Sequence, residues 1–162
     1  MTMLAFLLLS VLVTSVGALT PLSREDANSL NNELEQVRQN VSVQSIFGNN
    51  LLICLVMFVP ILGPIFGLWA LYNTGVVIAA ESIVQGIPSF LILSSLLILP
   101  FAWPEFISYS TALAESVWLI QRARRGMIRR EIKNAAVLVA IVAVMLLIGA
   151  TIETALILYL GG

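Results

Sequence analysis

The chain has 162 residues, of which 59% are hydrophobic and 10% charged, and eight basic against nine acidic residues give a net charge of -1. Soluble domains are about 45–50% apolar and about 25% charged, so this composition excludes a water-soluble globular domain. The chain has no histidine and one cysteine, Cys54, which excludes an intrachain disulfide and metal centres built on His and Cys, and we expect no metal and no cofactor. We predict an all-α, multi-pass transmembrane helical bundle that forms a single membrane domain over residues 1–162.

The first apolar run covers residues 3–19 and carries no charge. It has no basic residue in front of it, and Val16-Gly17-Ala18 resembles the cleavage site of a signal peptide. A short span and a signal-like segment both fit this run, and we favour the span.

Residues 20–47 form the one sizeable polar stretch, and we expect an amphipathic helix there on the outer side of the membrane. Ser23 followed by Asp26 resembles a capping box. Apolar residues then recur at helical spacing and form a narrow seam. They are Ala27, Leu30, Leu34, Val37 and Val41. The simpler interpretation is a helix lying on the membrane surface or on its own bundle, and the alternative is a contact with a partner or a second copy.

Four further apolar segments bring the predicted number of spans to about five, since a span needs roughly 20 apolar residues. They cover residues 50–73, 75–99, 105–120 and 135–160. Gly63 and Gly67 form a small-xxx-small step that permits close helix packing, and the nearby prolines predict a kink or break. A turn is expected at Asn73-Thr74-Gly75, and Gly86-Ile87-Pro88 interrupts the span that follows it.

Six of the eight basic residues lie in one loop, residues 121–134. They are Arg122, Arg124, Arg125, Arg129, Arg130 and Lys133. The positive-inside rule makes this loop cytoplasmic and the protein a multi-pass plasma membrane protein, with the N-terminus cytoplasmic and the C-terminus outside. The loop is either a topology signal alone or a contact for anionic lipid head groups at the cytoplasmic face. Nucleic-acid binding is not expected, because no aromatic residues are interleaved with the arginines.

Four acidic residues fall in or at the edge of apolar runs, where a charge costs at least about 2.5–3.5 kcal/mol on insertion scales. They are Glu81, Glu105, Glu115 and Glu153. Candidate polar partners at the predicted span ends are Asn49, Asn50 and Asn73. One interpretation makes these seven residues a structural polar set that holds the bundle together, and the other makes them an ion, proton or substrate path.

An ordered series of short motifs resembles the stage II sporulation protein M family of integral membrane proteins over roughly residues 46–160. The motifs are Ile46-Phe47-Gly48-Asn49-Asn50, Gly63 with Gly67, Asn73-Thr74-Gly75, Leu99-Pro100 before Pro104-Glu105, and Gly149-Ala150-Thr151-Ile152-Glu153. Two departures accompany them: Thr74 intervenes where the family usually reads Asn-Gly, and Phe101-Ala102 stands where it usually has His-Gly. The resemblance implies a membrane protein whose namesake works in a membrane complex with cell-wall hydrolases.

Two functional hypotheses follow, and neither is an enzyme. The first is a structural or complex-forming envelope protein that assembles as a homo-oligomer, a dimer being the simplest case, or with other membrane proteins. Its contacts would be Gly63 and Gly67, the outer amphipathic helix and the last span. The alternative is a transporter or channel for an ion or small solute, in which Glu81, Glu105 and Glu153 face a polar cavity.

Overall fold

The computed structural model describes residues 3–38, 41–126 and 128–160, and within these ranges it contains seven helices and no strand. The predicted all-α class is confirmed. The helices are α1 (Met3–Gly17), α2 (Arg24–Arg38), α3 (Val43–Met57), α4 (Leu62–Gln85), α5 (Ser89–Ile98), α6 (Ala102–Ala123) and α7 (Ile128–Leu160).

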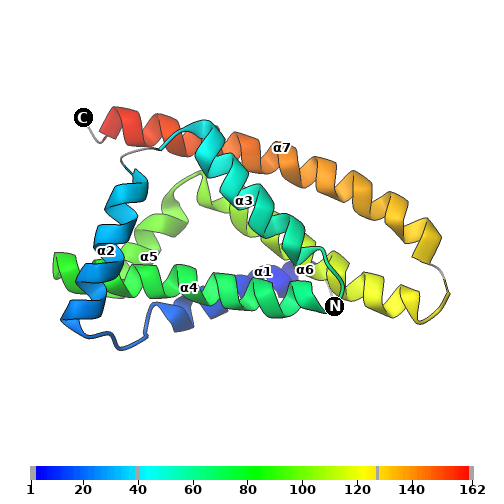
Figure 1. Ribbon diagram of the computed structural model, residues 1–162, viewed down its shortest axis with the longest axis horizontal. Helices are drawn as coiled ribbons and strands as arrows, with labels where there is room; N and C mark the ends of the chain where they lie inside the picture. The colour runs from blue at the N-terminus through cyan, green and yellow to red at the C-terminus, as the bar shows by residue number, and fades with distance from the viewer. Residues whose placement is uncertain (1–2, 39–40, 127, 161–162) are drawn as a thin grey trace.

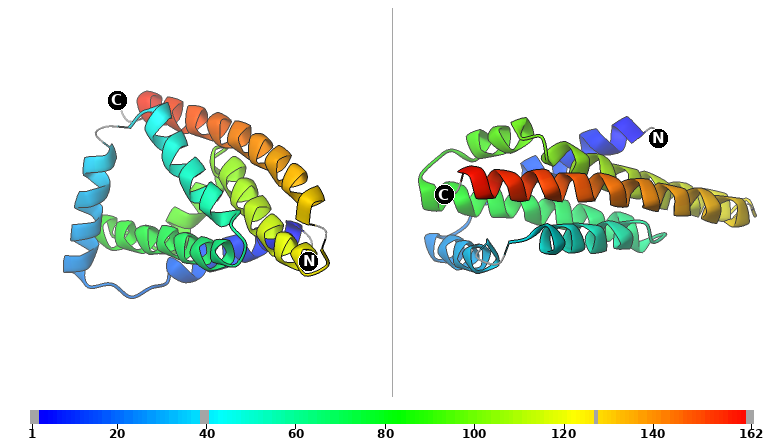
Figure 2. Two further views of the ribbon diagram at one scale, coloured as in Figure 1. Left: turned by 45° about the vertical axis from the view of Figure 1, so that its right-hand side comes forward. Right: turned by 90° about the horizontal axis from the view of Figure 1, so that it is seen from above.

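The long helices run between two ends of the molecule (Figures 1 and 2). At one end, α2 lies across the bundle beside the end of α4, and α7 also ends there; we call this the α2 end. At the opposite end lie the start of α1, the break between α3 and α4, and the end of α6 (Figure 1). We call it the basic end, because Arg122, Arg124 and Arg125 lie there at the end of α6.

Among the described residues, two helical segments are long and apolar enough to cross a membrane. They are Leu62–Gln85, with a mean hydropathy of 1.4, and Lys133–Tyr159, with a mean hydropathy of 2.9. The pair α5 and α6 makes a third if it is one broken span, bent by 90°. The helices α1 and α3 are apolar but have 15 residues each. Membrane-compatible helices are therefore present, while the total of about five spans and the outer position of α2 stay predictions.

The predicted turn at Asn73-Thr74-Gly75 is wrong, because α4 is helical from Leu62 through these residues to Gln85. Asn73 Nδ2 donates to the Trp69 carbonyl at 2.7 Å, and Thr74 Oγ1 donates to the Ala70 carbonyl at 3.2 Å. Polar side chains that bond back to the preceding turn are satisfied inside the helix, so they do not end it.

The expected breaks at proline and glycine are confirmed in two places. The chain leaves the helix between α3 and α4, where Pro60 lies and Ile61 has a φ of 72°. α4 then ends at Gly86, whose φ of 69° is the left-handed conformation of a helix C-cap. The predicted basic loop is shorter than residues 121–134, because α6 continues to Ala123 and α7 begins at Ile128.

Close packing concentrates where glycines meet neighbouring helices. A Cβ on Gly63 would lie 2.0 Å from the Met57 carbonyl oxygen, and one on Gly67 would lie 2.6 Å from a Leu113 methyl group on α6. Both glycines therefore pack within the chain, which leaves neither of them on a surface for a second copy. The largest fully buried side chains, Met57, Leu113 and Leu146, come from α3, α6 and α7 and form the centre of the core.

Candidate functional site

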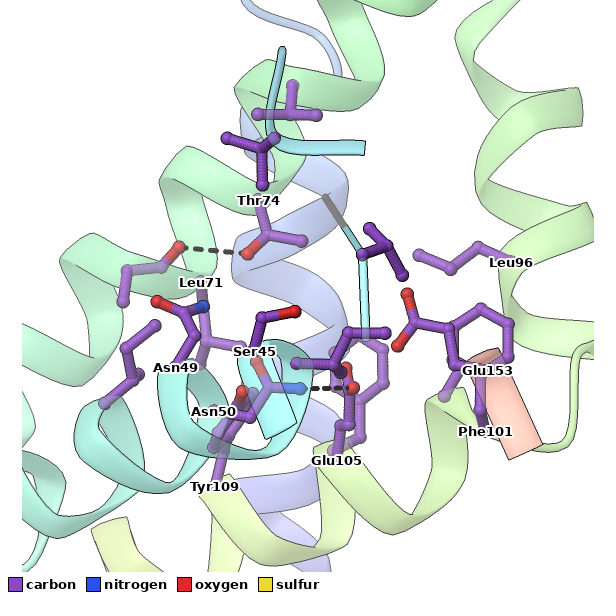
Figure 3. Close-up of a pocket in the computed structure, with 18 of the residues that line it drawn as sticks. Ser45, Asn49, Asn50, Leu71, Thr74, Leu96, Phe101, Glu105, Tyr109 and Glu153 are labelled. Carbon is purple, nitrogen blue, oxygen red and sulfur yellow. Dashed lines mark hydrogen bonds between the residues drawn. The ribbon is translucent and has the colours of Figure 1, made fainter. Parts of the chain in front are cut away.

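A cavity of about 450 Å³ lies near the α2 end, between α3, α4, α6 and α7. Two acidic side chains from different helices line it: Glu105 from α6 and Glu153 from α7 (Figure 3). The two carboxylates are close enough to interact electrostatically. No lysine or arginine occurs among the described residues that line the cavity.

Amide and hydroxyl groups surround the two carboxylates. Asn50 Nδ2, from α3, donates to Glu105 Oε1 at 2.6 Å (Figure 3). Asn49 and Thr74 line the same cavity, and the Tyr109 hydroxyl lies within electrostatic range of both glutamates. The cavity thus has a polar side that is rich in hydrogen-bond acceptors and carries negative charge when the carboxylates are ionised.

Helical periodicity explains how these residues come to face one space. Ser45, Asn49 and Ile53 recur every four residues along α3, so they share one face of that helix. Glu105 and Tyr109 are also four residues apart on α6. Each helix therefore turns one mixed polar and apolar stripe toward the cavity.

The remaining walls of the cavity are apolar and aromatic. Phe101 and Phe106 come from the start of α6, and Leu71 comes from α4. Phe101 and Ala102 are the pair that departs from the family pattern noted in the sequence, so this departure falls on the cavity itself.

The amphipathic helix α2 covers the cavity with its apolar seam. Leu34 and Val37 of α2 line the cavity, together with Val41 just after it. The predicted cap of α2 is present, since the Asp26 amide donates to Ser23 Oγ at 3.1 Å and Ser23 Oγ donates to the Asp26 carboxylate at 2.6 Å. The seam is therefore used inside the molecule, at least in part, and its polar side faces away.

The bend between α5 and α6 places the first turn of α6 against the cavity. The two helices meet at 90°, and the Trp103 indole Nε1 donates to the Leu97 carbonyl at 3.0 Å across the bend. Pro104 sits in the first turn of α6, where a missing backbone N–H costs nothing. Glu105 lies in the same turn, where the helix dipole favours a carboxylate.

The structure brings together four of the seven predicted polar residues and separates the other three. Asn49, Asn50, Glu105 and Glu153 line the cavity. Asn73, Glu81 and Glu115 do not line it. Sequence reasoning missed Thr74 and Tyr109 as lining residues, although the spacing of Tyr109 four residues after Glu105 was a usable signal.

Glu115 lies instead in a second pocket of about 320 Å³ near the basic end, between α6 and α7. Its side chain is 2% exposed, and its Oε1 has no hydrogen-bond partner among the described residues. Arg122 lines the same pocket, with its guanidinium 5.8 Å from the centre of the Trp118 ring. Asn134 and Val137 of α7 complete the opposite wall.

The other basic residues of the predicted loop lie close to the residues of this pocket in the sequence. Arg124, Arg125 and Lys133 are exposed. Arg129 and Arg130 lie on α7, and their side chains fall outside the described residues. Within the described residues, no group of three or more His, Cys, Asp or Glu side chains is arranged to hold a metal ion.

The chain matches the model of a known protein family. The model of a family described as Stage II sporulation protein M matches residues 2–156, which is nearly the whole chain. The search of curated proteins and the search of solved structures gave no match.

Proposed function

The chain belongs to the stage II sporulation protein M family, and we propose that this membrane protein is a carrier that binds a small organic cation in the cavity between α3, α4, α6 and α7. One observation carries the proposal: Glu105 and Glu153 line a single cavity without any lysine or arginine among its described lining residues. Two neighbouring carboxylates in a membrane domain are costly when both are ionised, and a cationic ligand bound beside them would lower that cost.

The size and lining of the cavity favour an organic cation over a metal ion. Its volume of about 450 Å³ lies within the range of about 300–1,000 Å³ found for organic ligands. Phe101, Phe106 and Tyr109 offer aromatic surface, which attracts ammonium groups. Two carboxylates occur among the described lining residues, and in the described part of the chain no group of three or more His, Cys, Asp or Glu side chains is placed to hold a metal ion.

The proposed topology has five crossings, made by α1, α3, α4, the bent pair α5 with α6, and α7. The arrangement of the helices supports this topology, since each of these helices or pairs runs from one end of the molecule to the other (Figure 1). A helix of 15 residues spans about 22 Å, which a locally thinned bilayer accommodates. The basic end would be cytoplasmic, and the cavity beneath α2 would then open outside. Exposed Arg124, Arg125 and Lys133 would contact anionic head groups.

The test compares two probes of nearly equal size and different charge, benzylammonium and benzyl alcohol. Purified protein in nanodiscs should bind benzylammonium at least about tenfold more tightly than the alcohol, because a hydrogen bond to a charged group contributes about 1.5–3 kcal/mol. Glu105→Gln and Glu153→Gln should each remove most of this preference. Glu81→Gln is the matched control, because Glu81 belongs to α4 and does not line the cavity.

Equal binding of the two probes, or an unchanged preference in both glutamate variants, would refute the proposal. Uptake of benzylammonium into liposomes then separates a carrier from a binding protein. A wild-type protein that binds the probe without transporting it would restrict the proposal to binding.

A complex-forming envelope protein is the second candidate, and α2 supplies the observation that favours it. Glu25, Asp26 and Glu33 on α2 are exposed, so an acidic surface lies at the α2 end. We propose that any partner protein or second copy docks there rather than at Gly63 or Gly67, which pack within the chain. Native mass spectrometry of the gently extracted protein tests this: a Glu25→Lys, Glu33→Lys variant should lose the partner, and a monomeric wild type would refute it.

A further inference from the structure

We propose that α5 lies flat in the membrane, within the leaflet at the α2 end, and contacts the acyl chains of that leaflet through the face that carries Phe90, Leu91 and Ile98. The crossing that the proposed topology gives to the bent pair is then made by α6 alone. This placement of α5 depends on the proposed topology and not on the ligand of the cavity.

The residues of α5 suit hydrocarbon rather than water. Seven of its ten residues are apolar and the other three are serines, and residues 82–104 include no charged residue. Ser94 Oγ donates to the Phe90 carbonyl at 2.6 Å, and Ser95 Oγ donates to the Ile92 carbonyl at 2.7 Å. These two exposed hydroxyls are therefore satisfied within the helix and need no water.

The rest of the protein leaves one face of α5 uncovered. No residue of α5 is buried, and Phe90, Leu91 and Ile98 have exposed fractions of 64%, 48% and 80%. The opposite face turns toward the bundle, where Leu96 lines the cavity (Figure 3). A helix that is apolar on both its inner and its outer face belongs in hydrophobic surroundings. Because α5 lies outside the protein core, lipid provides those surroundings, and α5 stands between the acyl chains and the cavity.

The direction of α5 follows from its bend against α6. The two helices meet at 90°, and α6 runs alongside α7 to the basic end (Figures 1 and 2). If α6 crosses the membrane, a helix perpendicular to it lies near the membrane plane. The chain enters α5 directly after the end of α4, which lies at the α2 end, so α5 belongs to the leaflet on that side (Figure 1).

The helix α6 is long enough to make this crossing without α5. Its 22 residues extend over about 33 Å, and the hydrocarbon core of a bilayer is about 30 Å thick. Ten of these residues are buried, because α6 packs against α1, α3, α4 and α7. A helix shielded by its neighbours can carry polar residues across a membrane, since they face protein instead of lipid.

Acyl chains suit the outer face of α5 better than a second copy of the chain does. A helix of ten residues is about 15 Å long and about 10 Å wide, so one face of α5 offers roughly 150 Å². Each partner in a stable protein interface buries about 800 Å². The charged residues that fix the register between two proteins are also missing from α5, whereas acyl chains need no register.

Spin labels on single cysteines measure the depth of α5 in reconstituted bilayers, from their collisions with oxygen and with a water-soluble nickel chelate. Leu91→Cys and Ile98→Cys lie on one side of the helix, about 10 Å apart along its axis. Spanning helices tilt by about 20° on average, so labels on a helix perpendicular to α6 should differ in depth by less than about 4 Å.

The matched control is the pair Val137→Cys and Val144→Cys on α7, which has the same spacing and exposed fractions of 60% and 59%. These two labels should differ in depth by about 10 Å, because α7 crosses the membrane in the proposed topology. The native Cys54 is fully buried, and the wild type treated with the label provides the blank. Size exclusion establishes that each labelled variant is folded.

A depth difference of about 10 Å on both helices would overturn the flat placement of α5 and leave the proposed topology intact. Equal depths for the α7 pair would overturn the topology and the placement of α5 together. Collision of the nickel chelate with the α5 labels would show that water covers this face. Immobilised labels shielded from both oxygen and nickel would show that protein covers it, and either result would overturn the contact with acyl chains.

Discussion

The contact between α1 and α4 and the cavity beneath α2 represent opposite ways of packing helices in a membrane protein. At the α1–α4 contact, a Cβ on Gly75 would lie 2.1 Å from the Thr14 carbonyl oxygen, and a Cβ on Gly17 would lie 2.1 Å from the Tyr72 carbonyl oxygen. The two backbones therefore touch. At the cavity, Glu105 and Glu153 line a space of about 450 Å³ that no side chain of the described residues fills.

This difference shows what polar and small residues do when lipid is the solvent. Lipid tails are as apolar as leucine, so burial of apolar side chains drives helix association only weakly, and backbone contact provides the attraction instead. Polar side chains need partners, and helices that share them across a cavity leave room for a ligand. The close-packed contact is therefore the part expected to determine stability, and the cavity is the part expected to determine function.

The largest expected effect is that of a side chain added at the close-packed contact. Gly75→Val should cost about 3 kcal/mol or more of the free energy of unfolding, because the atom it meets is the backbone oxygen of Thr14, which moves only if α1 moves. Folded yield on size exclusion and thermal unfolding in mild detergent measure this cost. Gly48→Val is the matched control, since nothing lies within 4 Å of its Cβ position. Similar stability of the two variants would contradict the contact.

The next effect concerns a contact in which the neighbour is a flexible side chain. Leu113→Ala should cost about 2–4 kcal/mol, because Leu113 is 1% exposed and its removal leaves a hole. Gly67→Ala should cost about 1–3 kcal/mol, because its Cβ would lie 2.6 Å from a Leu113 methyl group. The double variant should cost less than the sum, since the added methyl fills part of the hole. Unfolding of the three variants in a double-mutant cycle measures this coupling, and simple additivity would contradict it.

Sequence patterns predicted the helix cap and the helix breaks, which depend on residues close together in the chain. The Ser23 cap, the break near Pro60 and the interruption at Gly86-Ile87-Pro88 each follow from residues within one turn, and all three are present. The turn expected at Asn73 failed because its amide bonds back to Trp69, and no short motif distinguishes a turn from a helix that satisfies its own polar side chains.

The cavity was only partly predictable because it depends on how the helices are rotated and staggered. Asn73 precedes the lining residue Thr74 by one position, which turns it about 100° away on α4. Glu81 lies seven residues after Thr74, on the same side but about 10 Å farther along the helix. The sequence identified glutamates and asparagines as candidates, and only the packing of four helices selected Glu105 and Glu153 from them.

A smaller effect is expected in α2, the helix that covers the cavity. Ser23→Ala removes the acceptor for the Asp26 amide, which should destabilise the start of α2 by about 1 kcal/mol. Amide hydrogen exchange in α2 should accelerate about fivefold, and benzylammonium should dissociate faster, while global unfolding stays nearly unchanged. Ser29→Ala is the control, because Ser29 lies on the exposed side of α2 beyond its first turn. Equal exchange in the two variants would show that the cap does not hold the cover in place.

The smallest effect is expected at the break between α3 and α4, and it has the opposite sign. Ile61 has a φ of 72°, a conformation that side chains branched at Cβ rarely adopt, and its side chain is 66% exposed. Ile61→Gly should therefore stabilise the break between α3 and α4 by about 0.5–1 kcal/mol. Ile65→Gly provides the comparison: Ile65 is 67% exposed but lies inside α4, where glycine should cost about 1 kcal/mol. Thermal unfolding of the two variants should shift in opposite directions. If both variants unfolded at a lower temperature than the wild type, the fold would require the isoleucine side chain at the break despite its strained backbone. Stability there would then depend on the side chain and not on backbone contact.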